Sequence, residues 1–487
     1  MPHEVPPGRI RALNDAPPRS GGGFVLYWMI AARRTGWSFG LQRAVELARE
    51  LRRPLLVLEA LRAGHPWAAE RFHRFVLDGM ADNARRFDKA GVTYHAYVEP
   101  EAGAGRGLLA ALGGRACAVV TDDFPAFFLP RMVRAAADRV PVRLEAVDSN
   151  GLLPLRATDR VFATAHSFRS FVQRQLAGHL DALPAADPLA GGLPGRAEIP
   201  RNVLQRWPAV EGRLLDGTGS LAALPIDHAV AAGPLRGGRE AARRVLQEFL
   251  DERLERYVED RNHPDLDATS GLSPYLHFGH IAAHEVFAAL MTREAWHEGK
   301  LGRSTRGARE GWWGVSPPAE AFLDQLVTWR ELGFQHCARD AFADRWPSLP
   351  TWARATLEKH AGDPRPRVYD LATLEGGRTH DALWNAAQTQ LVREGRMHND
   401  LRMLWGKKIL EWSPSPEVAL DRMLRLNDRR ALDGRDPNSI SGIGWVLGRY
   451  DRPWGPERPV FGTVRFMSST NTARRVRVKD YLRRYAP

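Results

Sequence analysis

"FVLYWMIAARRTGWSFGLQRAVELARELRRPLLVLEAL", residues 24–61, carries the hydrophobic pattern from which the fold of the first part of the chain can be predicted. A short apolar run at 24–30 is followed by a turn rich in arginine and glycine, a helical stretch and a second apolar run at 54–61. Two short apolar runs separated by a helical pattern are typical of parallel strands joined by a crossover helix. The stretch therefore predicts a βαβ unit.

The same alternation continues to about residue 150. "VTYHAYVEP", "ACAVVTDD" and "PVRLEAVDSN" are strand-like, and helical segments lie between them, the longest at 68–89. Repeated alternation of strands and helices predicts an α/β domain with a mostly parallel, doubly wound, Rossmann-like sheet.

After residue 183 the character of the sequence changes twice. A stretch rich in proline and glycine, such as "LPAADPLAGGLPGRAEIP", predicts a connector on the surface, and helical patterns dominate from Arg239 onward. The N-terminal segment is rich in proline and glycine and is expected to be flexible. The predicted parts are a flexible tail (1–22), an α/β domain (23–183), a connector (184–237) and an all-helical domain (238–487).

Composition limits the class of protein. The two cysteines, Cys117 and Cys337, lie far apart without CxxC spacing, so we expect neither a disulfide framework nor a metal site, and a reducing cytoplasm fits. No apolar run approaches the roughly 18 residues that a membrane helix needs, so we expect no membrane span. The net charge of +12 fits a protein that binds nucleic acid, but an arginine-rich composition alone explains it equally well.

Two further stretches carry unusual residue patterns. "WNAAQTQLVREGRMHNDLRMLWGKKILEW", residues 384–412, predicts a helical segment that carries Trp384, Trp405 and Trp412 and has few residues typical of a surface. Tryptophans in such a pattern are usually packed core residues. In "RNHPDLDATSGLSPYLHFGHI", hydroxyl residues precede a helix that is expected to begin near Pro274, an arrangement that suits a phosphate but is also an ordinary helix cap.

Four stretches together resemble the photolyase/cryptochrome family, and most closely its class II cyclobutane pyrimidine dimer (CPD) photolyases. They are "TSGLSPYLHFGHI", "LVTWREL", the tryptophan-rich stretch above and "LNDRRALDGRDPNSISGIGW". The resemblance extends from Phe24 to the C-terminus and is most specific between residues 254 and 467. It implies an N-terminal antenna-type domain and a helical domain that binds FAD.

The resemblance also implies an activity. Reduced FAD, excited by light, donates an electron to a pyrimidine dimer flipped out of DNA, the cyclobutane ring splits, and the electron returns. Damaged DNA would be the partner of a monomeric enzyme, a deoxyribodipyrimidine photo-lyase. The residues implied to bind FAD are Tyr257, Thr269, Ser270, Leu272, Ser273, Arg330, Arg402 and Asp433, the last two as an ion pair.

The remaining site residues are implied by the same resemblance. Asn427 would lie near the flavin N5 atom, and Trp384, Trp405 and Trp412 would form a route for electrons from the surface to the flavin. Flat aromatic faces suit a flipped base. The residues implied to contact DNA or the dimer are Arg261, Asn262, Trp329, Met403, Trp445 and Arg465.

Two departures from the family leave alternatives open. Gln325 stands where the family carries a catalytic glutamate; an amide can donate a hydrogen bond but cannot release a proton. In the first domain, "MIAARRTGWSFGL" differs from the family pattern, so a deazaflavin-type antenna is not assured. A cryptochrome-like blue-light photoreceptor and a flavin-free nucleic-acid binder are the alternatives to the repair enzyme.

Overall fold

A computed structural model describes residues 4–486 and divides the chain into two compact units. Unit 1 consists of Met1–Asp159, Gln175–Gln247 and Leu272–Ala295, and unit 2 of Arg160–Arg174, Glu248–Gly271 and Trp296–Pro487. Each unit therefore combines segments that are distant in sequence. The domain bounds expected from the sequence, 23–183, 184–237 and 238–487, stay a prediction.

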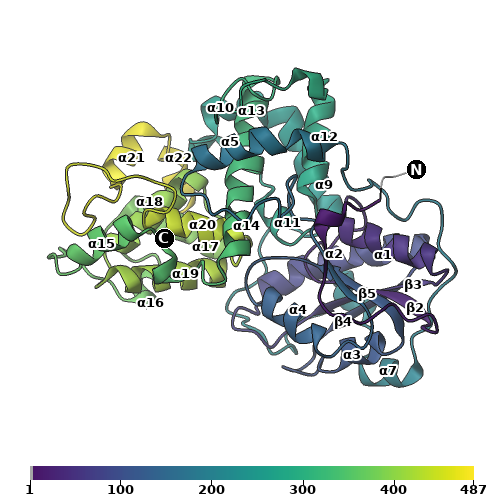
Figure 1. Cartoon of the computed structure of the whole chain (residues 1–487). Coiled ribbons are helices and arrows are strands. Elements are labelled where there is room, and N and C mark those ends of the chain that lie inside the picture. Colours follow the sequence, from purple (N-terminus) through teal and green to yellow (C-terminus); the bar gives the residue numbers. More distant parts are fainter. Residues whose placement is uncertain (1–3, 487) are drawn as a thin grey trace. The chain divides into compact units, whose positions relative to one another are not determined.

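Unit 1 is built on a sheet. Within residues 4–486, six strands form it in the order β1-β6-β5-β2-β3-β4 (Figure 1). Every neighbouring pair is parallel except β1 and β6, which are antiparallel. The prediction of a mostly parallel sheet is confirmed. The strands are β1 (Ile10–Ala12), β2 (Phe24–Met29), β3 (Leu55–Leu61), β4 (Thr93–Val98), β5 (Ala116–Asp122) and β6 (Leu144–Val147).

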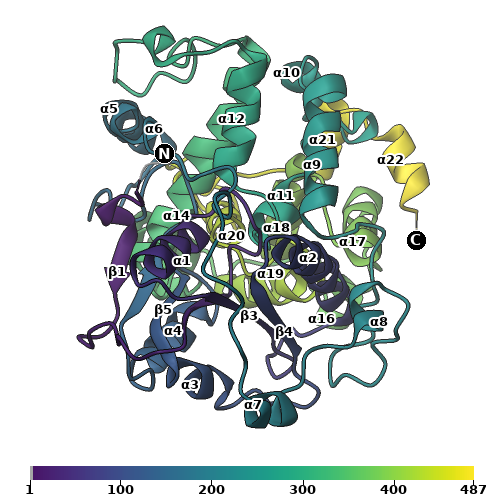
Figure 2. The ribbon, with the colours of Figure 1, turned by 90° about the vertical axis from the view of Figure 1, so that its right-hand side faces the viewer.

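Helices cover both faces of this sheet. Alternate residues of β2 point to opposite faces, so Val25 and Tyr27 pack with α1 (Phe39–Glu50), while Leu26 and Trp28 pack with α3 (Leu108–Gly113) and α4 (Leu129–Ala137). Figures 1 and 2 show α1 and α2 (Glu70–Lys89) on one face and α3 and α4 on the other. The sheet is doubly wound, as the sequence predicts. The other helices of unit 1 are α6 (Ala177–Leu180), α7 (Arg201–Arg206), α8 (Gly212–Leu215), α9 (Arg239–Glu248), α11 (Ser273–His277) and α12 (Ala283–Arg293).

The prediction of a flexible tail at residues 1–22 is wrong for residues 4–22, the part of it that the structure describes. Ile10–Ala12 pairs with β6 as an edge strand, and Arg9, only 2% exposed, lies 3.5 Å from the carboxylate of Asp148. Val5 is buried as well. Proline and glycine are tolerated beside an edge strand as well as in a flexible chain, so composition alone misled the prediction. Residues 1–3 lie outside the described part of the chain.

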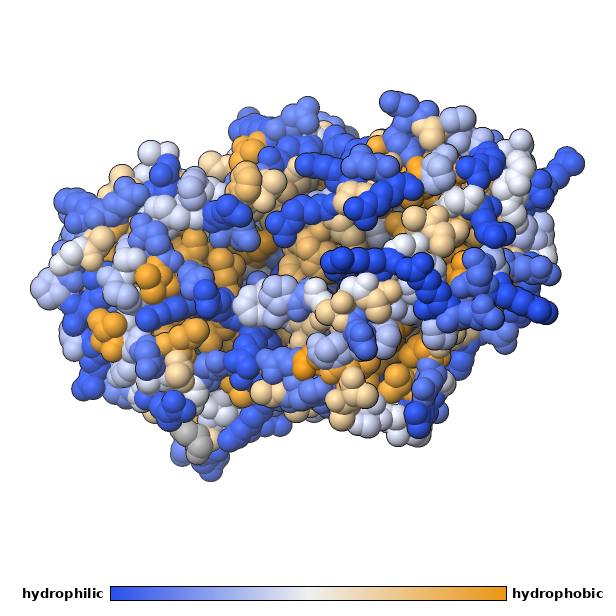
Figure 3. Space-filling view, turned by 90° about the horizontal axis from the view of Figure 1, so that it is seen from below, coloured by the Kyte–Doolittle hydropathy of each residue, from blue (hydrophilic) through white to orange (hydrophobic). Residues whose placement is uncertain are grey.

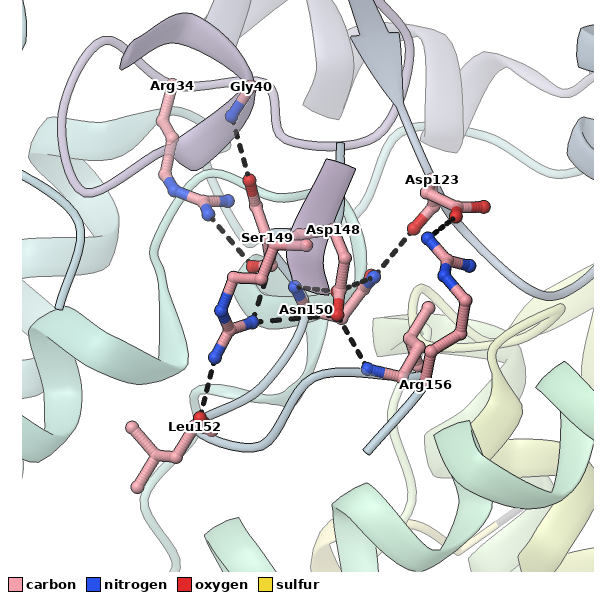
Figure 4. Close-up of polar contacts among 10 residues, drawn as sticks. Arg34, Gly40, Asp123, Asp148, Ser149, Asn150, Leu152 and Arg156 are labelled. Atoms are coloured by element: carbon pink, nitrogen blue, oxygen red, sulfur yellow. Dashed lines mark hydrogen bonds and ion pairs between the residues drawn. The ribbon is translucent and has the colours of Figure 1, made fainter. Parts of the chain in front are cut away.

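A network of polar side chains lies beyond the carboxyl ends of β5 and β6 (Figure 4). Asn150 donates to the backbone oxygen of Asp123 at 2.6 Å and to the carboxylate of Asp148 at 2.7 Å. Arg156 forms an ion pair with Asp123 at 2.6 Å, and Arg34 donates to the backbone oxygen of Ser149 at 3.3 Å. These contacts hold the loop after β6 against the sheet.

The regular secondary-structure elements of unit 2 are all helices in its described residues, as the sequence predicts for this part of the chain, and loops connect them. Two of its segments, η2 (Phe249–Arg253) and η5 (Asp324–Trp329), are π-helical. Its α-helices are α5 (Ala165–Gln175), α10 (Tyr257–Asp260), α13 (Pro317–Leu323), α14 (Arg330–Arg339), α15 (Thr351–Lys359), α16 (Leu371–Glu375), α17 (Ala382–Glu394), α18 (Asn399–Glu411), α19 (Pro416–Arg430), α20 (Pro437–Val446), α21 (Ser469–Arg475) and α22 (Lys479–Arg484).

The surface shown in Figure 3 is a mosaic in which hydrophilic side chains surround small apolar patches. Among the described residues, no helix is both long enough and apolar enough to cross a lipid bilayer. Nor do those residues contain a group of three or more His, Cys, Asp or Glu side chains that could hold a metal ion.

Candidate functional site

The tryptophan-rich stretch forms two helices, so the expectation of one helical segment at 384–412 is corrected. Gly395 ends α17 in the left-handed conformation (φ 70°), and α18 begins at Asn399. A left-handed residue after the last helical turn is best supplied by glycine, which has no Cβ to clash. The break allows α18 to pack against α17 rather than extend it.

The three tryptophans lie in the interior of unit 2. Trp384 is 0% exposed, Trp405 3% and Trp412 2%. The indole nitrogen of Trp384 donates to the backbone oxygen of Trp405 at 3.0 Å, and the rings of Trp384 and Trp412 are 5.4 Å apart. The indole nitrogen of Trp405 donates to Gln388 at 2.8 Å. The structure thus brings the three predicted residues together in the order Trp405, Trp384, Trp412.

Two residues that the sequence did not single out lie between Trp412 and the surface. Tyr369, half-buried, and His380, exposed, each have their rings 5.4 Å from that of Trp412. The hydroxyl of Tyr369 lies 2.7 Å from Nδ1 of His380. Both residues precede α17, and their sequence pattern gives no signal for this contact. Trp412 is therefore not the outermost aromatic side chain of the series.

Arg402 and Asp433 form the predicted ion pair. One guanidinium nitrogen lies 3.0 Å and 3.3 Å from the two carboxylate oxygens. The side chains are 19% and 15% exposed, so the pair is partly shielded from water. A guanidinium in such surroundings needs a partner, and Asp433 supplies it.

Asn427 lies near this pair in sequence and is 4% exposed on α19. Its amide nitrogen donates to the hydroxyl of Ser439 at 2.9 Å and to Asp428 at 3.1 Å. Its Oδ1 accepts no hydrogen bond from any residue between 4 and 486. The amide is thus oriented by its neighbours and keeps one acceptor atom for a ligand.

Asp428, half-buried, and Arg435, buried, form a pair beside Asn427 that the sequence reasoning missed. The backbone nitrogen of Arg435 donates to Asp428 at 2.9 Å, and the guanidinium donates to the backbone oxygens of Asp428 and Ala431. Burial lowers the pKa of Arg435 to about 10 and raises the pKa of Asp428. The sequence "NDRRALDGRD" is too rich in charge to reveal which of its residues are buried.

The π-helical segment η5 presents Gln325 and Trp329. Both are half-buried, whereas the other residues of Asp324–Trp329 are buried. Short π-helical turns within α-helices occur often at functional sites, because the extra residue changes the direction of the following side chains. Arg330 follows at the start of α14; it is 9% exposed, and its guanidinium lies 4.2 Å from the ring of Phe334.

The carboxylate of Asp324, the residue before Gln325, is already engaged by an arginine. This carboxylate is 4% exposed and lies 2.8 Å from a guanidinium nitrogen of Arg169 on α5. Of these two neighbouring side chains, Gln325 is the one that is partly exposed.

Trp445 is half-buried near the end of α20, with cations beside its ring. Nζ of Lys407 lies 5.3 Å from the ring centroid and donates to the backbone oxygen of Val446 at 2.5 Å, while the guanidinium of Arg465 lies 5.5 Å away. Burial lowers the pKa of Lys407, which is 0% exposed, to about 7. Lys407 is a further residue that the sequence reasoning missed.

Arg465 itself is held from two sides. It lies 4.0 Å from the ring of Trp454 and forms an ion pair with Asp451 at 3.3 Å. Trp454 in turn donates to Asp451 at 3.1 Å. The predicted DNA-contacting arginine is therefore fixed beside Trp445.

The other predicted residues of unit 2 are more dispersed. Tyr257 is buried and packs edge-on against Phe322 at 5.7 Å, and the guanidinium of Arg261 lies 5.2 Å above the Tyr257 ring. Burial raises the pKa of Tyr257. Asn262 and Met403 are half-buried, and Met403 lies on α18.

The predicted hydroxyl turn is shared between the units. Thr269 and Ser270 are half-buried in unit 2, and Leu272 and Ser273 belong to unit 1. In unit 1, Leu272 is buried and Ser273 is exposed at the first position of α11, which has no side-chain cap. The helix start predicted near Pro274 is confirmed.

Comparisons with known proteins give the chain's relationships. No family model matches the sequence. The deoxyribodipyrimidine photo-lyase of Methanothermobacter thermautotrophicus is 34% identical over 482 residues, which cover 98% of this chain and 97% of that protein. The enzymes of the same name from Potorous tridactylus and Arabidopsis thaliana are 31% and 32% identical, over 95% and 98% of this chain and 81% and 92% of their own length.

The fold has a counterpart among solved structures. A bacterial class III photolyase from Agrobacterium tumefaciens matches with a TM-score of 0.66 and 18% identity, over 95% of this chain and 86% of that one. At this identity the match supports the fold alone, a parallel sheet with helices followed by a helical part. The sequence relatives extend over nearly the whole chain at more than 30% identity. The chain belongs to the deoxyribodipyrimidine photo-lyase family.

Proposed function

We infer that this protein is a light-dependent photolyase that repairs cyclobutane pyrimidine dimers in DNA, in the manner of class II enzymes. The observation that carries this inference is the 34% identity to a relative named deoxyribodipyrimidine photo-lyase over 98% of the chain. Relatives from an animal and a plant with the same name support it.

We propose FAD as the cofactor. The donor set of unit 2 fits a flavin: Arg402 with its partner Asp433, and the oriented amide of Asn427 with a spare acceptor atom. Arg330, Tyr257, Thr269, Ser270, Leu272 and Ser273 complete the proposed FAD-binding set. When bound and reduced, FAD supplies the light-excited electron that splits the cyclobutane ring and takes it back afterwards.

The chain's own residues would receive the flipped dimer. The half-buried rings of Trp329 and Trp445 offer flat faces for stacking, worth roughly 1–3 kcal/mol for each base. The amide of Gln325 would donate a hydrogen bond to a carbonyl oxygen of the dimer, where charge accumulates when the electron arrives. Met403 and Asn262 would supply the apolar and polar sides of the site, and Arg261 and Arg465 the contacts to phosphate.

Trp405, Trp384 and Trp412 would conduct electrons inward to reduce an oxidised cofactor. Indole is readily oxidised, and the 5.4 Å separation of the Trp384 and Trp412 rings permits a short transfer. A deazaflavin-type antenna, a monomeric state and a cytoplasmic location stay predictions.

The decisive experiment illuminates the reduced, flavin-loaded protein with an oligonucleotide that contains one cyclobutane dimer, and measures the intact pyrimidines formed. Loss of dimer in the light but not in the dark is expected. A yellow, flavin-binding protein that leaves the dimer intact would point to the photoreceptor alternative, and a colourless protein that takes up no FAD would contradict both. The absorption spectrum of the purified protein tests the antenna, because a second chromophore adds a band that the flavin lacks.

A further inference from the structure

A segment of unit 2 before α13 presents three arginines at regular spacing. Residues 302–309 read "GRSTRGAR", with Arg303, Arg306 and Arg309 at every third position, and all three side chains are exposed. From Lys300 to Glu310 four basic residues stand against one acidic residue. A charge run of this kind is usually only solvated, so its function depends on how the segment is held.

Side chains of α5 fix the backbone of this segment. The hydroxyl of Ser170 donates to the backbone oxygen of Thr305 at 2.7 Å. Gln173 accepts from the backbone nitrogen of Gly307 at 2.7 Å and donates to the backbone oxygen of Ala308 at 2.8 Å. Gly307 has φ 82° and leaves a Cβ no room, because it would lie 2.7 Å from a backbone oxygen of α5. The arginines therefore project from an ordered backbone rather than from a loose loop.

The exposed charges of the segment are not neutralised by the protein. Arg303 and Arg306 form no ion pair with any residue in the range 4–486. Arg309 lies 3.6 Å from Asp324, but that carboxylate is already paired with Arg169 at 2.8 Å. Arg169 and Arg309 thus share one carboxylate, whereas Arg303 and Arg306 have none, and the segment keeps a net positive charge.

The segment is also tied to the proposed lesion site. Asp324, the residue that Arg309 approaches, begins the π-helical segment η5 and directly precedes Gln325. Figure 1 shows α5 alongside α13, the helix that continues into η5. An arginine row that starts beside η5 is suited to a polyanion whose damaged base is bound there.

We propose that Arg303, Arg306 and Arg309 form a strip that contacts the phosphate backbone of the DNA strand next to the dimer. The proposal rests on the function inferred above. Three residues of chain span at most roughly 10 Å, which equals about three nucleotide steps measured along the axis of the DNA duplex. Successive long arginine side chains can therefore reach separate phosphates of one strand. Phosphate contacts position the DNA and carry no information about the lesion.

The test measures the affinity of the protein for dimer-containing and for undamaged duplexes in the dark, over a range of salt concentrations. The unmodified protein is compared with the double variant Arg303→Gln/Arg306→Gln. Each lost phosphate contact lowers the slope of log affinity against log salt by about 0.9. The slope of the double variant should therefore be smaller by about 1.8. Between 50 and 200 mM salt, its affinity should fall by a factor about ten times smaller than that of the unmodified protein. Both duplexes should be affected equally, so the preference for the dimer should persist.

The matched control is Arg131→Gln/Arg134→Gln, two exposed arginines with the same spacing on α4. It should keep the slope of the unmodified protein. All variants should retain the melting temperature, because the four side chains are exposed. A double variant at 303 and 306 with an unchanged slope overturns the arginine strip. An unmodified protein that does not prefer dimer-containing DNA instead overturns the proposed function, and the two failures are thus distinguishable.

Discussion

Substitution of Lys407 by methionine tests the effect of a buried charge beside Trp445 in the proposed lesion site. Lys407 is 0% exposed, and its Nζ lies between Trp445 and the backbone oxygen of Val446. Methionine has a similar volume and no charge. The variant removes the ammonium while keeping the packing of the side chain.

The expected size of the stability change follows from the pKa of Lys407. Burial, the dominant cause, lowers the pKa of Lys407 from 10.5 to about 7. The unfolded chain therefore holds the proton more tightly than the folded protein, so the penalty on stability is fully present below pH 7 and is lost as the pH rises toward 10.5. At about 1.4 kcal/mol for each pKa unit the full penalty is about 5 kcal/mol, of which about 3 kcal/mol is relieved between pH 6 and pH 9.

Two measurements check this reasoning. The gain in the free energy of unfolding of the Lys407→Met variant over the unmodified protein should be about 3 kcal/mol larger at pH 6 than at pH 9. The chain has six lysines, so carbon-13 NMR of labelled lysine side chains should resolve one signal that titrates near pH 7 and is missing in the variant.

Lys408→Met is the control, because Lys408 is the neighbour of Lys407 on α18 and its ammonium is paired with Glu411 at 2.8 Å. Its effect on stability should be the same at both pH values. The lost hydrogen bond to Val446 shifts the Lys407→Met stability by a similar amount at each pH and does not imitate the predicted difference. A stability difference that does not vary with pH, or a Lys407 signal that titrates near pH 10, would refute the assignment of a buried, easily deprotonated ammonium.

Three further predictions concern the proposed chemistry. Gln325→Glu should raise the number of dimers repaired per absorbed photon, since a carboxyl group can supply a proton that the amide cannot; an equal or lower yield in the purified variant contradicts this. Asp433→Asn should weaken FAD retention about tenfold, because Arg402 loses its counter-charge, as measured by flavin release on dilution; unchanged retention would exclude a role of the pair in holding the cofactor. Trp405→Phe should slow the light-driven reduction of oxidised flavin, followed by absorbance, while repair by chemically reduced protein stays the same; a loss of both would show that the substitution damages the site itself.

Local patterns in the sequence were enough for the secondary structure that depends on them. Alternating apolar runs and helical periods predicted β2, α1 and β3 and the parallel sheet, because each strand and helix needs only its own neighbours to set its period. The same patterns failed at Ile10–Ala12, where pairing with β6 orders a segment whose composition suggests a tail. They also failed between Trp384 and Trp412, where one left-handed glycine separates two helices.

Sequence patterns were sufficient to predict the sheet-forming first part, the helical second part and, through the resemblance to a family, the positions at which to look for a site. The three-dimensional packing was needed to show that Asp324 is engaged by Arg169, that Tyr369 contacts Trp412, and that Lys407 lies against the ring of Trp445. Each of these contacts joins residues that are tens of positions apart. Such contacts depend on how helices pack, and packing is a property of the whole fold that no local period encodes.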